Sequence, residues 1–207
     1  MANLKVKQFI DLFNYEAGLK ANRHQTFILK IVENLCPDYF FHAPASIPGT
    51  HHKGLSIIDH TLLVCNAGLK LAPVFRLEDA ADEISAACML HDLIKFGRQY
   101  DREITEIANI DGTQKKMYPR PAEEDITGTH GHQLAAAIFD LFKGDLDWRQ
   151  LEIADGIRYH MGRWTKQHTD SKGIVNDCYG WERSCFTRLI HMADVTVAYG
   201  ARYDECG

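Results

Sequence analysis

The chain has 207 residues, of which 45% are hydrophobic and 25% are charged, as in ordinary globular proteins that bury a core of their own. Its formal net charge of -5 provides no overall positive field, so we do not expect it to bind duplex nucleic acid. No apolar run approaches the ~18 residues of a membrane span, and the N-terminus lacks the apolar core of a signal peptide. We therefore expect no membrane partner and a cytoplasmic location.

Two amphipathic segments open the chain. Residues 6–19 and 24–35 repeat apolar side chains at helical spacing, and Pro37 ends the second segment because proline disfavours helical geometry in the residue before it. Neither segment carries an obvious chemical group. We interpret residues 1–36 as a helical scaffold or a cap.

A loop and a third helix follow. Residues 40–54 are rich in proline and glycine, which predicts a loop, and this loop carries His51 and His52. Residues 55–71 return to the apolar spacing of a helix. His60 stands inside this helix.

The next helix carries an adjacent histidine and aspartate. Its apolar spacing runs over residues 77–96, and Gly97 is a typical stop. His91, Asp92 and Lys95 fall in its last turns, and Lys95 projects from the same face as His91 because it follows four residues later. His91 and Asp92 can serve one site together only if the helix end bends or if the carboxylate bridges two ions.

The segment after residue 98 changes character. Asp111-Gly112 lies between two β-prone stretches, which predicts a small β-hairpin near residues 103–118. Three more helical patterns follow, over residues 131–143, 148–161 and 181–199. No alternation of strands and helices is present, so the sequence predicts an all-α helical bundle.

Imidazole and carboxylate groups are distributed over five of these helices. Such groups are the common protein ligands of zinc, manganese and iron, and a helical bundle can project them toward one point. The carboxylate at position 194 is an independent indication, because it lies in an apolar stretch where burial is costly unless the group is paired or metal-bound. His130 competes with His132 for a place in the set. The candidate metal ligands are His60, His91, Asp92, His132, His160 and Asp194.

This pattern resembles the HD-domain metal-dependent phosphohydrolases, and His132 and His160 resemble the additional histidines of their two-metal branches. The local likeness is to the HD domain of bacterial 3′-to-5′ exoribonucleases. It rests on His51-His52 before Gly54-Leu55, on HDLIK at residues 91–95, on Gly131-His132 and on His160-Met161-Gly162. The chain has no segment like the OB-fold of those enzymes, and Met161 stands where they have a second histidine.

The resemblance implies one HD-type domain over residues 1–207, with a metal-binding core over residues 44–197. It implies one divalent ion held by His60, His91, Asp92 and Asp194, and a second ion that Asp92 bridges to His132 and His160. The metal is left open among manganese, iron, zinc, nickel and magnesium. Asp92 and Lys95 are the expected catalytic residues, with Lys95 facing the phosphate oxygens. The expected substrate contacts are Lys95, His51, His52, Arg98 and Arg163.

The activity we expect is hydrolysis of a phosphate ester in a nucleotide or short oligonucleotide at two metal ions. Two other readings share these residues. Some HD-fold proteins hold two irons with a similar ligand set and act as oxygenases. Conjugative relaxases with an HD-like domain resemble the stretch from Pro44-Ala45-Ser46 to His51-His52, which gives a DNA-processing module as the third reading.

Overall fold

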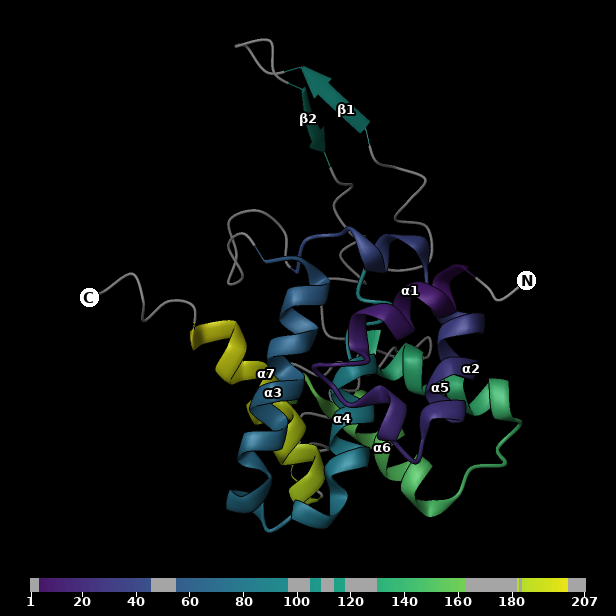
Figure 1. The fold of residues 1–207 in the computed structure, drawn as a ribbon, viewed down its shortest axis with the longest axis vertical. Helices are drawn as coiled ribbons and strands as arrows, with labels where there is room; N and C mark the ends of the chain where they lie inside the picture. The colour runs from purple at the N-terminus through teal and green to yellow at the C-terminus, as the bar shows by residue number, and fades with distance from the viewer. Residues whose placement is uncertain are drawn as a thin grey trace, which may run out of the picture.

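The computed structural model describes residues 4–45, 55–96, 105–108, 114–117, 130–162, 182 and 184–200. In these residues the chain forms seven α-helices (Figure 1). They are α1 (Leu4–Phe13), α2 (Gln25–Leu35), α3 (Ile57–Phe75), α4 (Ala81–Leu90), α5 (His130–Phe142), α6 (Trp148–Tyr159) and α7 (Cys185–Gly200). Short 3-10 turns lie at Leu19–Ala21, Asp38–Phe41 and Glu78–Ala80. The predicted all-α fold is confirmed.

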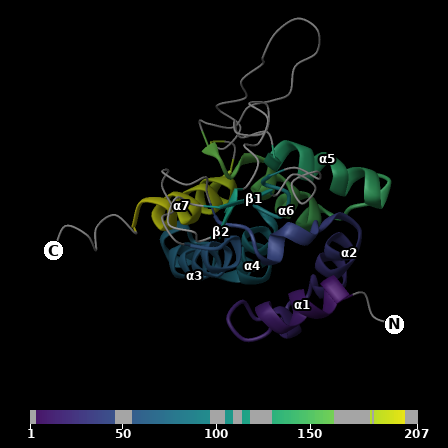
Figure 2. The same cartoon turned by 90° about the horizontal axis from the view of Figure 1, so that it is seen from above.

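Four helices form the centre of the bundle. The longest of them, α3, packs against both α7 and α4; α4 also packs against α6, and α6 contacts α5 and α7. Figures 1 and 2 show α1 and α2 at the edge of this bundle, away from α7. Phe9 of α1 and Phe27 of α2 are buried in the same apolar core as the central helices. Residues 4–36 therefore contribute packing to the bundle, as a scaffold would.

Small residues let the central helices approach closely. An added Cβ at Gly68 of α3 would lie 3.0 Å from both Cys88 Sγ and Ile84 Cγ2 of α4. At Gly156 of α6, it would lie 2.7 Å from Phe186 of α7. Close packing of this kind resists added volume, so these two glycines fix how near α4 and α7 stand to their neighbours.

Helix α3 begins with a capping box, in which the Ser56 side chain and the Asp59 side chain each bind the other's backbone N–H. By length and composition this 19-residue helix could cross a membrane. Its packing against α4 and α7 and its buried His60 instead make it a core helix of the bundle.

The predicted hairpin is also confirmed. Strand β1 (Thr105–Ala108) pairs with β2 (Gln114–Met117) in antiparallel register, with Thr105 opposite Met117 and Ala108 opposite Gln114. Both strands lie within the predicted range of 103–118.

Candidate metal centre

The backbone departs from the α-helix where His91 and Asp92 occur. Helix α4 ends at Leu90, and the next hydrogen bonds join residues three apart, from Leu93 N to Leu90 O at 3.0 Å and from Lys95 N to Asp92 O at 3.1 Å. The predicted continuation of the α-helix to Phe96 is therefore wrong. Because the chain tightens here, the adjacent His91 and Asp92 side chains both point inward, with 0% and 1% of their surfaces exposed.

His60, His91 and Asp92 form the first ligand group. The Nε2 atoms of His60 and His91 lie 3.3 Å apart, and Asp92 Oδ2 lies 3.6 Å and 3.5 Å from them. Asp194 on α7 stands beside this group, with its Oδ1 3.1 Å from His60 Nε2. The start of α3, the chain just after α4 and the middle of α7 thus bring four of the predicted ligands together.

The second ligand group consists of Asp92, His130 and His160. Here the other carboxylate oxygen, Asp92 Oδ1, lies 3.0 Å from His130 Nε2 and 3.5 Å from His160 Nε2. The two imidazole Nε2 atoms are 2.9 Å apart. The two oxygens of Asp92 therefore face two different groups, which is the arrangement expected of a bridging carboxylate.

His130 occupies the place predicted for His132. Residues two apart on a helix project in nearly opposite directions, so only one of this pair can face the cluster. His132 instead accepts a hydrogen bond from Arg158 Nε at 3.0 Å and packs edge-on against Tyr159. The geometry therefore favours His130, which is buried, over the predicted His132 as the metal ligand.

Gly131 explains how closely this part of α5 approaches α6. An added Cβ at Gly131 would lie 2.6 Å from Ile157 O and 3.1 Å from His160 Nδ1. Only glycine permits this approach. Gly131 thus brings His130 within reach of His160, and the sequence signal for it was the glycine between two histidines.

The orientation of the rings suits metal binding. The Nδ1 atoms of His91 and His160 each lie 2.7 Å from a backbone carbonyl oxygen, those of Cys88 and Ile157. A carbonyl only accepts, so Nδ1 carries the proton of each neutral ring, and the Nε2 lone pair of that ring then faces the cluster. Metal-binding histidines commonly have such a partner on the outer nitrogen, so these residues fit a divalent ion.

The protonation states also fit. Burial lowers the pKa of His91 to about 3, so its ring is neutral near pH 7. Burial alone would raise the pKa of Asp92, but Lys95, His91 and hydrogen bonds from His130 and His160 outweigh it and hold that pKa well below its usual value. The pKa of Asp194 is also lowered, because hydrogen bonding and charge from His60 outweigh burial. Neutral imidazole and ionised carboxylate are the forms that bind metal.

The pKa values of the two histidines in the second group shift in opposite directions. Burial lowers the pKa of His130 below its usual value. Burial also acts to lower the pKa of His160, but its hydrogen bond with Asp92 and the charges of Asp92 and Asp194 outweigh burial and raise it. A proton on the second group therefore resides preferentially on His160.

Lys95 lies at the edge of the cluster. Its Nζ is 2.5 Å from Asp92 Oδ2, and 19% of its side chain is exposed. The ammonium thus stands between the buried carboxylate and the outside of the site. The other predicted substrate contacts, His51, His52, Arg98 and Arg163, lie outside the described residues.

One buried histidine near the cluster was assigned no role from the sequence. His191 on α7 is 7% exposed, and its Nδ1 donates a hydrogen bond to the backbone carbonyl of His160 at 2.7 Å. Gly162 packs on its ring and has a φ of 58°, a conformation that favours glycine. The spacing of three residues between His191 and Asp194 was the available signal.

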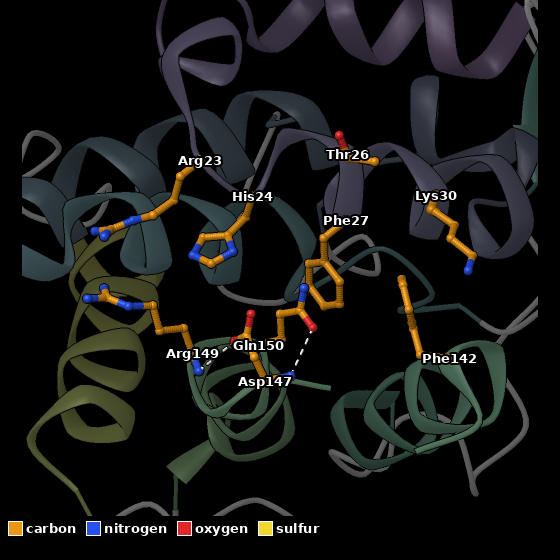
Figure 3. A pocket seen from close by; sticks show the side chains of 9 residues that line it. All are labelled: Arg23, His24, Thr26, Phe27, Lys30, Phe142, Asp147, Arg149 and Gln150. Carbon is orange, nitrogen blue, oxygen red and sulfur yellow. Dashed lines mark hydrogen bonds between the residues drawn. The ribbon is translucent and has the colours of Figure 1, made fainter. Parts of the chain in front are cut away.

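A pocket of about 490 Å³ lies apart from this cluster, between the starts of α2 and α6 and the end of α5 (Figure 3). Three of its lining residues bind the fully buried carboxylate of Glu83: Arg149 at 2.8 Å, His24 at 2.9 Å and Arg23 at 3.1 Å. Glu83 is in the first turn of α4. The network therefore ties the start of α4 to α2 and α6, at the opposite end of α4 from His91.

The chain belongs to the HD-domain family, because the model of that family matches residues 57–198, more than half of the sequence. The matched range includes every member of both ligand groups. Comparisons with curated proteins and with solved structures found no match. Family membership and the buried histidine–aspartate cluster together define the class: an HD-domain phosphohydrolase with a candidate metal site.

Proposed function

We propose that this enzyme hydrolyses a phosphate ester of a nucleotide or short oligonucleotide at a binuclear metal centre. The observation that carries the proposal is the position of Asp92, whose Oδ2 faces His60 and His91 while its Oδ1 faces His130 and His160. A single carboxylate shared by two ligand groups is what a pair of neighbouring ions requires.

The residues of the cluster have separate roles in metal binding and in charge stabilisation. His60, His91, Asp92 and Asp194 would hold one ion, and Asp92, His130 and His160 the other. When bound, two such ions supply Lewis acids that polarise a phosphoryl group and lower the pKa of a water molecule. Lys95 adds a fixed positive charge beside Asp92, where it can stabilise the charge of phosphate oxygens. The divalent metal is manganese, iron, zinc, nickel or magnesium.

The substrate class rests on the resemblance and on charge. The likeness to exoribonuclease HD domains supports a nucleotide or oligonucleotide, and the net charge of -5 argues against a long polyanion held along the surface. A substrate of a few nucleotides at most needs only the local charge of the ions and Lys95. We place this activity in the cytoplasm.

The proposal is tested by comparing the hydrolytic activity of the Asp92→Ala variant with that of the unmodified chain. Nucleotides, dinucleotides and a generic phosphodiester are offered to the full chain with Mn²⁺, and released phosphate or nucleoside is measured. Removal of the shared ligand should reduce kcat/KM by more than about 100-fold, since even partners outside the ligand shell contribute about 10–100-fold. Asp140→Ala, at an exposed acid of α5, is the matched control and should retain activity. Equal activity of the two variants would contradict the proposal.

The same imidazole and carboxylate ligands also suit iron, which keeps a di-iron oxygenase as the second candidate. Metal analysis after anaerobic purification separates the two chemistries. Two irons per chain that consume O₂ would favour the oxygenase, whereas phosphate-ester hydrolysis without O₂ would favour the phosphohydrolase.

A further inference from the structure

We infer that His191 and Gly162 form a latch that positions His160 for the second metal ion. The inference rests on the two-metal function proposed above and adds two residues that no ligand pattern includes. His191 is a positioning residue here, because it reaches the cluster only through the backbone of His160.

The latch joins the two ligand groups through their backbones. Asp194 beside the first group and His191 lie one turn apart on α7, so both move with that helix. The hydrogen bond from His191 Nδ1 to the carbonyl of His160 attaches the end of α6 to the same turn. This bond therefore holds Asp194 and His160, and with them the two groups, to the same part of α7.

Gly162 holds the His191 ring in place. A Cβ at this position would lie 2.3 Å from His191 Cε1 and 2.5 Å from Nε2, so the backbone of Gly162 lies directly against the ring. Its φ of 58° turns the chain back over His191 after α6 has ended. Any side chain at residue 162 would displace the ring from the carbonyl that it binds.

The other side of His160 is held independently. Its Nδ1 donates to Ile157 O, and Gly131 of α5 packs against the same carbonyl. Loss of the latch should therefore release the α7 side of His160 without unfolding the end of α6. The expected effect is selective. The affinity for the ion at His130 and His160 is weakened, and the affinity for the ion at His60, His91 and Asp194 is retained.

Titration of the metal-stripped full chain with Mn²⁺, followed by calorimetry and by elemental analysis of bound ions, tests the latch. His191→Leu removes the donor and should weaken one of two Mn²⁺ affinities by about 10–100-fold, the usual effect of losing a partner behind a metal ligand. His191→Asn keeps a donor at the Nδ1 position and should restore that affinity. Gly162→Ala should reproduce the loss without removing the histidine.

Thr187→Val is the matched control, because it removes a buried polar group four residues earlier on the same face of α7. Thr187→Val should lower the unfolding free energy about as much as His191→Leu does, and it should leave both Mn²⁺ affinities unchanged. The latch would be overturned if His191→Leu weakened both Mn²⁺ affinities equally or gave an isotherm like that of the unmodified chain. It would also be overturned if His191→Asn failed to restore the weakened affinity. If the unmodified chain binds no Mn²⁺ or a single ion, the two-metal function itself fails.

Discussion

At the scale of single residues, the cluster depends on which atom of each side chain faces inward. The sequence predicted one ligand set that includes His60, His91, Asp92, His160 and Asp194, and the structure brings these side chains close together. The sequence was insufficient to choose between His130 and His132. That choice depends on the rotation of α5 about its axis, which the contact of Gly131 with the end of α6 determines.

The pair provides a sharp prediction. His130→Ala should remove one of two bound ions and lower kcat/KM by more than about 100-fold, because a ligand is lost. His132→Ala should keep both ions and lose the hydrogen bond from Arg158, at a cost of about 1 kcal/mol in unfolding free energy. Elemental analysis of both variants gives the number of bound ions, and urea unfolding gives the free energy of unfolding. Loss of an ion from His132→Ala alone would restore the assignment made from the sequence.

At the scale of elements, α4 connects two polar sites. Its first turn holds Glu83 in the network drawn in part in Figure 3, and the chain just beyond its last residue holds His91 and Asp92. The helical period of residues 77–96 predicted a helix here but overran its end. Hydrophobic spacing cannot distinguish α-helix from the tighter turns of residues 91–96, because the change depends on where buried polar side chains must point.

The Glu83 network predicts a pH-dependent contribution to stability. Burial raises the pKa of Glu83, but hydrogen bonds from Arg149 and His24 and the charge of Arg23 outweigh it, so the pKa is lowered in the folded chain. The stabilisation is therefore complete above the ordinary pKa of about 4.5 and is lost as the pH falls through the lower folded value.

Glu83→Gln should lower the unfolding free energy by about 2 kcal/mol at pH 7, because it removes the buried charge that accepts hydrogen bonds from Arg149, His24 and Arg23. The difference from the unmodified chain should shrink as the pH falls below about 4.5. Urea unfolding over a pH series measures it, and the exposed Glu78→Gln should stay within about 0.5 kcal/mol throughout. A difference that grows toward acid pH would contradict the direction of the pKa shift.

At the scale of the molecule, the bundle brings together residues that are separated by up to 134 positions, from His60 to Asp194. The all-α class could be predicted because apolar spacing repeats along the chain. The direction in which each ligand points could not, since it depends on the turns after Leu90 and on how closely the helices approach at Gly68, Gly131 and Gly156. Their meaning depends on side chains far away in the sequence, such as Phe186 opposite Gly156.

The central claim is that Asp92 is shared by two metal ions. Anomalous X-ray diffraction from crystals of the Mn²⁺-loaded full chain tests it most directly. We expect two peaks about 3.5–4 Å apart, one beside Asp92 Oδ2 with His60 and His91, the other beside Oδ1 with His130 and His160. A single peak, or a second peak that His130 and His160 do not contact, would contradict it.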